Sequence, residues 1–198
     1  MDALRLLARK TLAVLDAWYY KRNRLHTLGP VLYLGRSRYR GPDLIFEDGT
    51  SLRDNEPVGR LHFNNTGIAA LGEGSLHRTG LKFAKLMRLS LFKLAQCAQS
   101  DPSFNDISVF EGVTWIPEHG KGVGFVSKPL PRSLRRLLLA AHFRLLLWAF
   151  APAAQTRAAG FAEPRRYWLT KAALANNLAK LAKGEVAPSQ HPPQSGEA

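Results

Sequence analysis

Apolar residues recur at helical spacing along much of the chain. In residues 2–22 and 79–99 they return every three or four positions, the period of a helix with one apolar side. Residues 134–151 are apolar around most of a helix circumference, and Ser133 can cap this helix. Thr170 can cap a last helix that runs through residue 183. In 79–99, the stripe that we expect to face the core is Phe83, Met87, Leu91, Leu94 and Ala98.

The helix expected over residues 2–22 is amphipathic. One side carries its apolar residues together with one threonine: Leu4, Leu7, Thr11, Val14, Leu15 and Trp18. The opposite side carries Arg5, Arg9 and Asp16.

Alternating apolar and polar residues predict several strands. In residues 58–65, Leu61 and Phe63 fall on one face, while the other face is polar. Residues 44–46 and 51–53 flank an Asp-Gly pair, which favours a hairpin turn. Further strands are expected at 31–34, 107–116 and 123–127. Strands flanked by helices without regular alternation predict an α+β fold with a mostly antiparallel sheet, packed with amphipathic and apolar helices in a single domain of residues 1–183.

The two ends of the chain point to a cytoplasmic protein with a disordered tail. Charged residues interrupt 1–21, so no uncharged stretch reaches the roughly 7 to 15 residues of a secretory signal. Arginines interrupt 134–151, whereas about 20 mostly apolar residues span a bilayer. Residues 184–198 contain three prolines and few apolar groups, which predicts disorder.

Charge is the unusual feature of the composition. The 198 residues include 28 Lys and Arg against 15 Asp and Glu, for a net charge of +13. The excess lies in 1–40 (+7), 76–100 (+5) and 121–198 (+9), which contain the helical patterns, while 41–75 and 101–120 are each −4. A helical surface is therefore expected to meet an anionic partner, either a membrane or a nucleic acid.

The chain resembles the YkoP-like domain family over roughly residues 10–180. The resemblance is carried by residues 29–65, in particular the Asp48-Gly49 turn and the strand end LHFN at 61–64, and by GVTW at 112–115. It implies a role in bacterial envelope polysaccharide or glycolipid functions and supplies no reaction. A deacetylase-type metal site does not carry over, because the chain lacks Asp and His at the spacing such a site needs.

One group of polar residues is a candidate for chemistry. His62 shares its strand face with Arg60 and Asn64, so a titratable ring lies between a cation and an amide that could hold an anionic substrate. The alternative is a solvated polar strand face. Glu111 alternates with apolar neighbours and either pairs with an arginine or acts as an acid or base.

Two helical surfaces have the pattern of shallow insertion among anionic lipid headgroups. The alternatives are a solvated lysine face and a buried central helix. The candidate residues are Lys82, Lys85, Leu89 and Lys93 on one helix, Arg135, Arg136, Arg144 and Trp148 on another, with Arg5, Arg9 and Lys10 from the first.

Other site chemistry finds little support. The histidines show no metal-ligand spacing, so no metal is expected, and no nucleotide or cofactor motif occurs. Cys97 lies near the apolar side of its helix, as an inert core thiol does.

Three function classes remain, and the sequence does not decide whether the protein is an enzyme. We favour an accessory factor that acts at the inner membrane surface in bacterial envelope lipid or polysaccharide biosynthesis, with an anionic membrane and envelope biosynthetic enzymes as partners. Next is a small enzyme that uses His62 on an anionic or lipid-linked substrate. A nucleic-acid-binding protein comes last, because no recognisable binding motif accompanies the charge.

Overall fold

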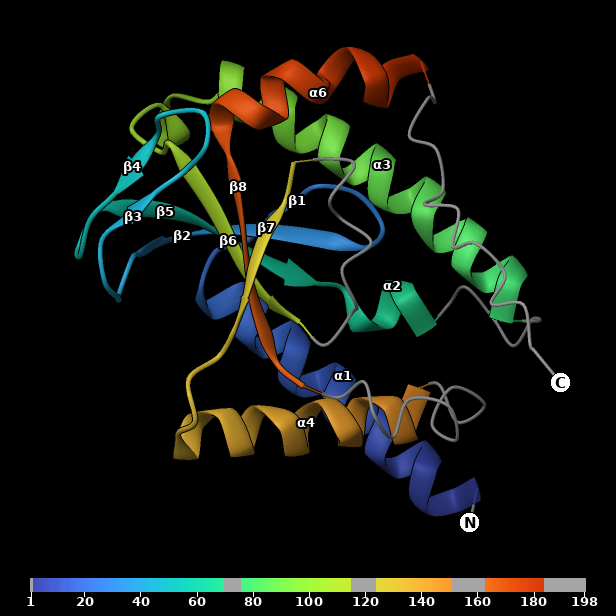
Figure 1. Cartoon of the computed structure of the whole chain (residues 1–198). Coiled ribbons are helices and arrows are strands. Elements are labelled where there is room, and N and C mark those ends of the chain that lie inside the picture. Colours follow the sequence, from blue (N-terminus) through green and yellow to red (C-terminus); the bar gives the residue numbers. More distant parts are fainter. Residues whose placement is uncertain (1, 70–75, 115–123, 151–162, 184–198) are drawn as a thin grey trace, which may run out of the picture.

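The computed structural model describes residues 2–69, 76–114, 124–150 and 163–183 (Figure 1). The elements in chain order are α1 (Asp2–Arg22), β1 (His26–Thr27), β2 (Leu32–Arg38), β3 (Leu44–Ile45), β4 (Ser51–Leu52), β5 (Pro57–Phe63), α2 (Asn65–Ala69), α3 (Leu76–Ser100), the 3-10 helix η1 (Pro102–Phe104), β6 (Val109–Thr114), β7 (Val126–Pro129), α4 (Leu134–Phe150), β8 (Arg165–Thr170) and α6 (Lys171–Lys183). The expected tail at 184–198 lies outside the described residues.

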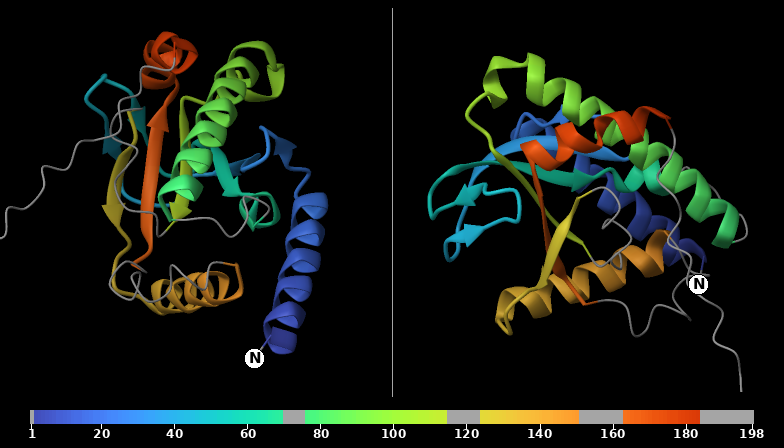
Figure 2. Two further views of the ribbon diagram at one scale, coloured as in Figure 1. Left: turned by 90° about the vertical axis from the view of Figure 1, so that its right-hand side faces the viewer. Right: turned by 45° about the horizontal axis from the view of Figure 1, so that its top comes forward.

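Six strands form one mixed sheet in the order β1-β2-β5-β6-β8-β7. In the described chain β5 and β6 pair in parallel, and every other pair is antiparallel. Helices α3 and α6 lie together at one end of the molecule, while α1 and α4 cross at the other (Figures 1 and 2). The predicted α+β fold with a mostly antiparallel sheet is confirmed.

The main core lies between the sheet and α3. Leu34 of β2, Phe110 of β6 and Leu169 of β8 alternate onto the same face of the sheet, where they meet Leu91 and Leu94 of α3. We call this face the α3 face. The stripe predicted for residues 79–99 is confirmed, since Ala98 is also buried, and Phe83 and Met87 pack against the same cluster.

The predicted hairpin forms a separate two-stranded sheet of β3 and β4. Gly49 has a φ of 81°, the left-handed conformation that glycine adopts without strain, and Asp48 accepts a hydrogen bond from the Thr50 amide at 2.9 Å. The hairpin covers a second apolar cluster on the opposite face of the six-stranded sheet. That cluster contains Tyr39, Phe46, Leu52, Val58, Val109 and Trp168.

The sequence pattern missed one central strand. Residues 165–170 form β8, which pairs with both β6 and β7, although we expected no strand there. The predictions at 107–116 and 123–127 were right in type, but β6 begins two residues later and β7 runs to Pro129; residues 115, 116 and 123 lie outside the described ones.

The two predicted helix caps are confirmed. The Arg136 amide donates to Ser133 Oγ at 3.3 Å, and the Ala173 amide donates to Thr170 Oγ1 at 3.0 Å. Each hydroxyl thereby satisfies an amide that has no acceptor within the first turn of its helix.

Candidate functional site

The face of the sheet opposite α3 carries a row of polar side chains. Strand pairing places Arg60 of β5 beside Glu111 of β6, and Glu111 beside Trp168 of β8. The next row along contains Val113, Arg166 and, on the edge strand β7, Lys128. We call this face, which also carries His62, the α1 face, because the carboxy-terminal half of α1 packs on it.

Glu111 is paired with an arginine, which was one of its two predicted roles. Arg60 donates through a terminal nitrogen to Glu111 Oε1 at 3.0 Å. The Glu111 side chain is 7% exposed and that of Arg60 37%, so the cation closes the solvent side of a buried carboxylate. Glu111 Oε2 and Trp168 Nε1 are also buried and have no hydrogen-bond partner among the described residues. The pair compensates a charge that would be costly if it were left alone.

His62 is packed beneath α1, so the alternative of a solvated strand face is wrong for this residue. Its Nε2 lies 3.4 Å from Tyr19 Oη, and the two rings meet edge to face with centroids 5.2 Å apart. Burial, assisted by the nearby charge of Arg60, lowers the pKa of His62 from 6.5 to about 4. The ring is therefore neutral at physiological pH.

The proposed trio of Arg60, His62 and Asn64 does not act together in this structure. Strand β5 ends at Phe63, and Asn64 Oδ1 accepts a hydrogen bond from the Gly67 amide at 3.0 Å, which fixes the start of α2. Arg60 forms an ion pair with Glu111, and His62 contacts Tyr19. These contacts favour structural roles, and catalysis by His62 and Glu111 stays a prediction.

Arg166 is a polar residue of this face that the sequence analysis missed. Its guanidinium carbon lies 5.9 Å from the centroids of both the Tyr39 and the Trp168 ring, and one terminal nitrogen donates to the Arg40 carbonyl at 3.1 Å. Its register partner is Lys128. The signal in the sequence was the run RRYWLT, in which aromatic residues typical of strands follow two arginines.

Helix α1 is docked through the side that the sequence suggested would face solvent. Arg5 lies over the Trp148 ring, Arg9 donates to the Ala149 carbonyl, and Asp16 accepts a hydrogen bond from Asn65 at 2.8 Å. Arg5 and Arg9 are therefore not surface cations, which corrects their assignment. Buried Leu12 and the two tyrosines Tyr19 and Tyr20 complete this docked side.

The apolar side of α1 is exposed as a result. We define the outer face of α1 as Leu4, Leu7, Val14, Leu15 and Trp18, which are between 55% and 68% exposed. Lys10, Lys21 and Arg22 are exposed on the same helix, and Arg22 lies over the Trp18 ring at 5.5 Å.

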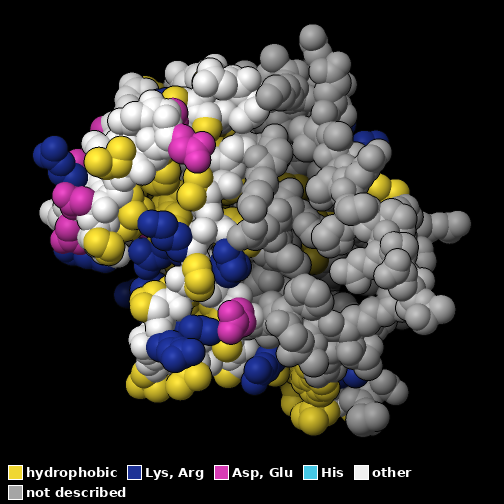
Figure 3. Space-filling model, viewed as in Figure 1, with side chains coloured by type: hydrophobic (Ala, Val, Ile, Leu, Met, Phe, Trp, Pro, Cys, Tyr) yellow, Lys and Arg dark blue, Asp and Glu magenta, His cyan; other side chains and the backbone are white. Residues whose placement is uncertain are grey.

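Helix α4 is half buried and half exposed. Phe143, Leu147 and Ala149 are buried, so the helix contributes to the core. Its outer face consists of four exposed leucines, with the exposed Arg135 and Arg144 at its borders: Leu134, Leu137, Leu138 and Leu145. Figure 3 shows apolar side chains along this lower edge of the molecule.

Two of the residues predicted for a membrane surface on α4 have other contacts. Arg136 donates to Glu163 at 2.8 Å and to the Leu130 carbonyl at 3.4 Å, and Trp148 packs against Arg5. Arg136 lies on the side of Phe143, because a helix repeats every 3.6 residues and these two are seven residues apart. Trp148 is half-buried by its contact with Arg5. Arg135 and Arg144 alone remain at the surface.

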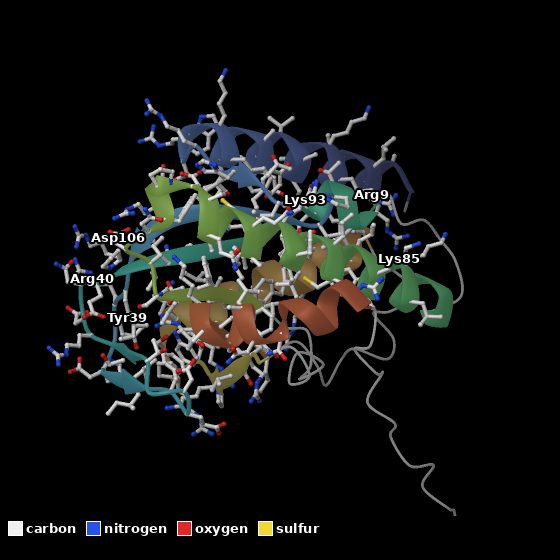
Figure 4. The ribbon with its side chains drawn as sticks, turned by 90° about the horizontal axis from the view of Figure 1, so that it is seen from above. Arg9, Tyr39, Arg40, Lys85, Lys93 and Asp106 are labelled. Carbon is white, nitrogen blue, oxygen red and sulfur yellow. The ribbon has the colours of Figure 1, made fainter. Side chains whose placement is uncertain are left out.

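The lysine surface of α3 is exposed as predicted. Lys82, Lys85 and Lys93 surround Leu89, and Figure 4 labels two of these lysines on α3. Leu89 is a single exposed leucine, which needs no special explanation. The helix packs on the opposite face of the sheet from α1, so this surface and the outer face of α1 belong to different sides of the molecule.

Neither a metal centre nor a membrane span is found in the described ranges. No three His, Cys, Asp or Glu side chains there lie close enough to hold a metal ion. None of the described helices combines the length and the apolar character that crossing a bilayer requires. Burial raises the pKa of the Cys97 thiol, which makes the reactive thiolate scarcer.

Comparison with known proteins gives one match. The family model described as the YkoP domain matches residues 5–178, which include most of α1, the whole sheet and part of α6. No curated protein and no solved structure matches the chain. The match extends over most of the chain and includes the residues on which the resemblance rested. The chain therefore belongs to the YkoP domain family.

Proposed function

We propose that this protein binds the anionic surface of a membrane through the outer faces of α1 and α4, as an accessory factor in bacterial envelope lipid or polysaccharide biosynthesis. The observation that carries the membrane step is the crowding of exposed apolar side chains on these two helices. Nine large apolar residues make up the two outer faces. The envelope role rests on the family resemblance.

The two helices that carry the outer faces contact each other. Helix α4 contacts the amino-terminal half of α1 through Arg5 and Arg9, and the helices cross at the end of the molecule away from α6 (Figure 1). Isolated apolar side chains are common on protein surfaces, but a contiguous group with a polar border marks an interaction site. The number of exposed apolar side chains on each helix distinguishes α1 and α4 from the lysine surface of α3, where lysines surround Leu89.

A bilayer fits these faces better than a purely apolar partner does, because cations border them. Each basic residue near an anionic surface contributes about 1 kcal/mol, whereas burial of one leucine-sized side chain contributes about 1.5–3 kcal/mol. The apolar residues therefore supply most of the affinity, and Lys10, Lys21, Arg22, Arg135 and Arg144 supply the preference for anionic lipid. Trp18 suits the headgroup level, where a ring with a polar edge meets both phases.

Flotation with vesicles tests the proposal. The full chain is expected to float with phosphatidylglycerol-containing vesicles and much less with phosphatidylcholine alone. A double variant, Leu7→Ser and Val14→Ser, should bind at least about tenfold more weakly. Leu81→Ser on α3 is the matched control, because Leu81 is also exposed but belongs to neither outer face.

Two results would contradict the membrane assignment. One is equal flotation of the double variant and the control. The other is a stable dimer of the wild-type chain that the double variant dissociates, measured by light scattering, because the outer faces would then cover one another.

A further inference from the structure

The Lys128 and Arg166 side chains form a pair of cations on the α1 face of the sheet. They are register partners on neighbouring antiparallel strands, so their Cβ atoms lie about 5 Å apart. Among the described residues neither side chain forms an ion pair, whereas the nearby Arg60 is neutralised by Glu111. The pair therefore contributes two positive charges at one point of the sheet.

The surroundings of Arg166 hold its guanidinium in a fixed orientation. The group lies over the Tyr39 and Trp168 rings, both of which are buried, and a hydrogen bond to the Arg40 carbonyl uses one terminal nitrogen. A guanidinium has five donors, so N–H groups that face neither the Arg40 carbonyl nor the Tyr39 hydroxyl stay available to a ligand. Lys128 is exposed on the neighbouring strand and can approach the same ligand as a mobile point charge.

Protection of the sheet edge does not explain the pair. Lysine on an edge strand such as β7 discourages pairing with other chains, and one charge is enough for that purpose. Like charges directly opposite each other destabilise a sheet. An anion bound between Lys128 and Arg166 would remove this repulsion.

We propose that Lys128 and Arg166 form a binding site for a phosphate monoester. Two cations that lack an ion-pair partner among the described residues match the charge of a dianion, and arginine offers the parallel donors that suit phosphate oxygens. Figure 3 shows Lys and Arg side chains gathered in the hollow between the hairpin and α4. The site is distinct from the outer faces of α1 and α4, and it does not depend on the membrane proposal.

The phosphate has two possible sources, a soluble phosphate ester or the headgroup of a lipid such as phosphatidic acid. Strand β7 ends at Pro129 and α4 begins at Leu134, so only residues 130–133 separate the site from the helix with the exposed leucines. This proximity makes the lipid source worth testing beside the soluble one.

Calorimetric titration of the full chain with inorganic phosphate, at constant ionic strength, tests the site. Wild type and Lys93→Gln are expected to bind one phosphate with equal affinity, while Lys128→Gln and Arg166→Gln each bind about tenfold more weakly. Lys93 is an exposed lysine on α3, so its variant has the same net charge as Lys128→Gln. Lys128→Gln also keeps the test valid if loss of the Arg166 ring contacts disturbs folding.

The source is identified by vesicle binding of the same variants. If a lipid phosphate is the ligand, Lys128→Gln should weaken binding to phosphatidic acid vesicles more than to phosphatidylglycerol vesicles of equal charge density. If a soluble ester is the ligand, phosphate affinity should fall and vesicle binding should stay unchanged. Equal phosphate affinity in Lys128→Gln and Lys93→Gln, or no saturable binding by wild type, would overturn the proposal.

Discussion

Helices α1 and α3 both carry an apolar stripe, yet they use it in opposite ways. In α3 the stripe meets the sheet, and Leu91, Leu94 and Ala98 are almost completely buried. In α1 the stripe faces away from the protein, and the helix is held by hydrogen bonds and ring contacts of its other side. A stripe thus shows that a helix has an apolar side without showing what that side contacts.

The largest expected effect is the difference in stability between truncating a leucine in the α3 stripe and truncating one in the α1 stripe. Leu94→Ala in α3 should lower the free energy of unfolding by about 2–5 kcal/mol, because a fully buried side chain leaves a cavity. Leu7→Ala in α1 should change it by less than about 0.5 kcal/mol, because Leu7 is 62% exposed. Urea unfolding followed by circular dichroism measures both. A comparable loss from Leu7→Ala would break the distinction between the helices.

The pH dependence of stability tests the contact of α1 with the sheet. His62 has a pKa of about 4 when folded and 6.5 when unfolded, so the unfolded chain binds the extra proton between these values. Protonation of His62 in the unfolded chain should lower the free energy of unfolding by roughly 3 kcal/mol as pH falls from 7 to 4. His62→Phe keeps a ring against Tyr19 but has no proton to bind.

The measurement is unfolding of both proteins at a series of pH values. The variant should lose less stability than wild type between pH 6.5 and 4. Identical slopes would show that His62 is accessible to protons in the folded state and that α1 does not cover it.

A smaller effect is expected from one hydrogen bond of α1. Tyr20 Oη donates to the Phe63 carbonyl at 2.8 Å, and the Tyr20 ring lies 4.3 Å from that of Tyr33. Tyr20→Phe keeps the ring contact and should cost about 1 kcal/mol of stability. Tyr33→Phe is a suitable control for loss of a phenol hydroxyl nearby. Equal stability of Tyr20→Phe and wild type would show that the hydrogen bond does not help to hold α1.

The smallest effect concerns Asp16, whose shifted pKa changes stability with pH in the opposite direction to that of His62. Burial raises the pKa of Asp16, although Asn65 donates a hydrogen bond to it. The folded protein therefore keeps this proton to higher pH than the unfolded chain, and its stability falls as pH rises through that range. Asp16→Asn should be slightly more stable than wild type at pH 7 and should lack this dependence. Loss of stability at pH 7 would show that the charge itself holds α1.

Local sequence patterns were sufficient to predict much of the fold. The α3 stripe, the Asp48-Gly49 turn and the caps at Ser133 and Thr170 depend on neighbouring residues, and each is confirmed. Strand β8 was missed because Arg165 and Arg166 obscure its apolar alternation, although Trp168 and Leu169 are buried.

Contacts between distant segments could not be predicted in this way. The parallel pairing of Arg60 with Glu111, the cover of Tyr19 over His62 and the meeting of Lys128 with Arg166 each join residues far apart in the chain. For α1, the aliphatic part of an arginine can pack while its charge reaches a carbonyl, as Arg9 does at Ala149, so a polar residue does not mark the outer side of a helix.

The parallel junction of β5 and β6 also bears on how the chain folds. It joins two antiparallel groups of strands, β1-β2-β5 and β6-β8-β7, and the connection between them runs from residue 64 to 108 and contains α3. Contacts that close so long a loop form slowly compared with a hairpin. The β2–β5 pair, separated by fewer residues, is expected to assemble first, and the second group would then join it once α3 has spanned the gap.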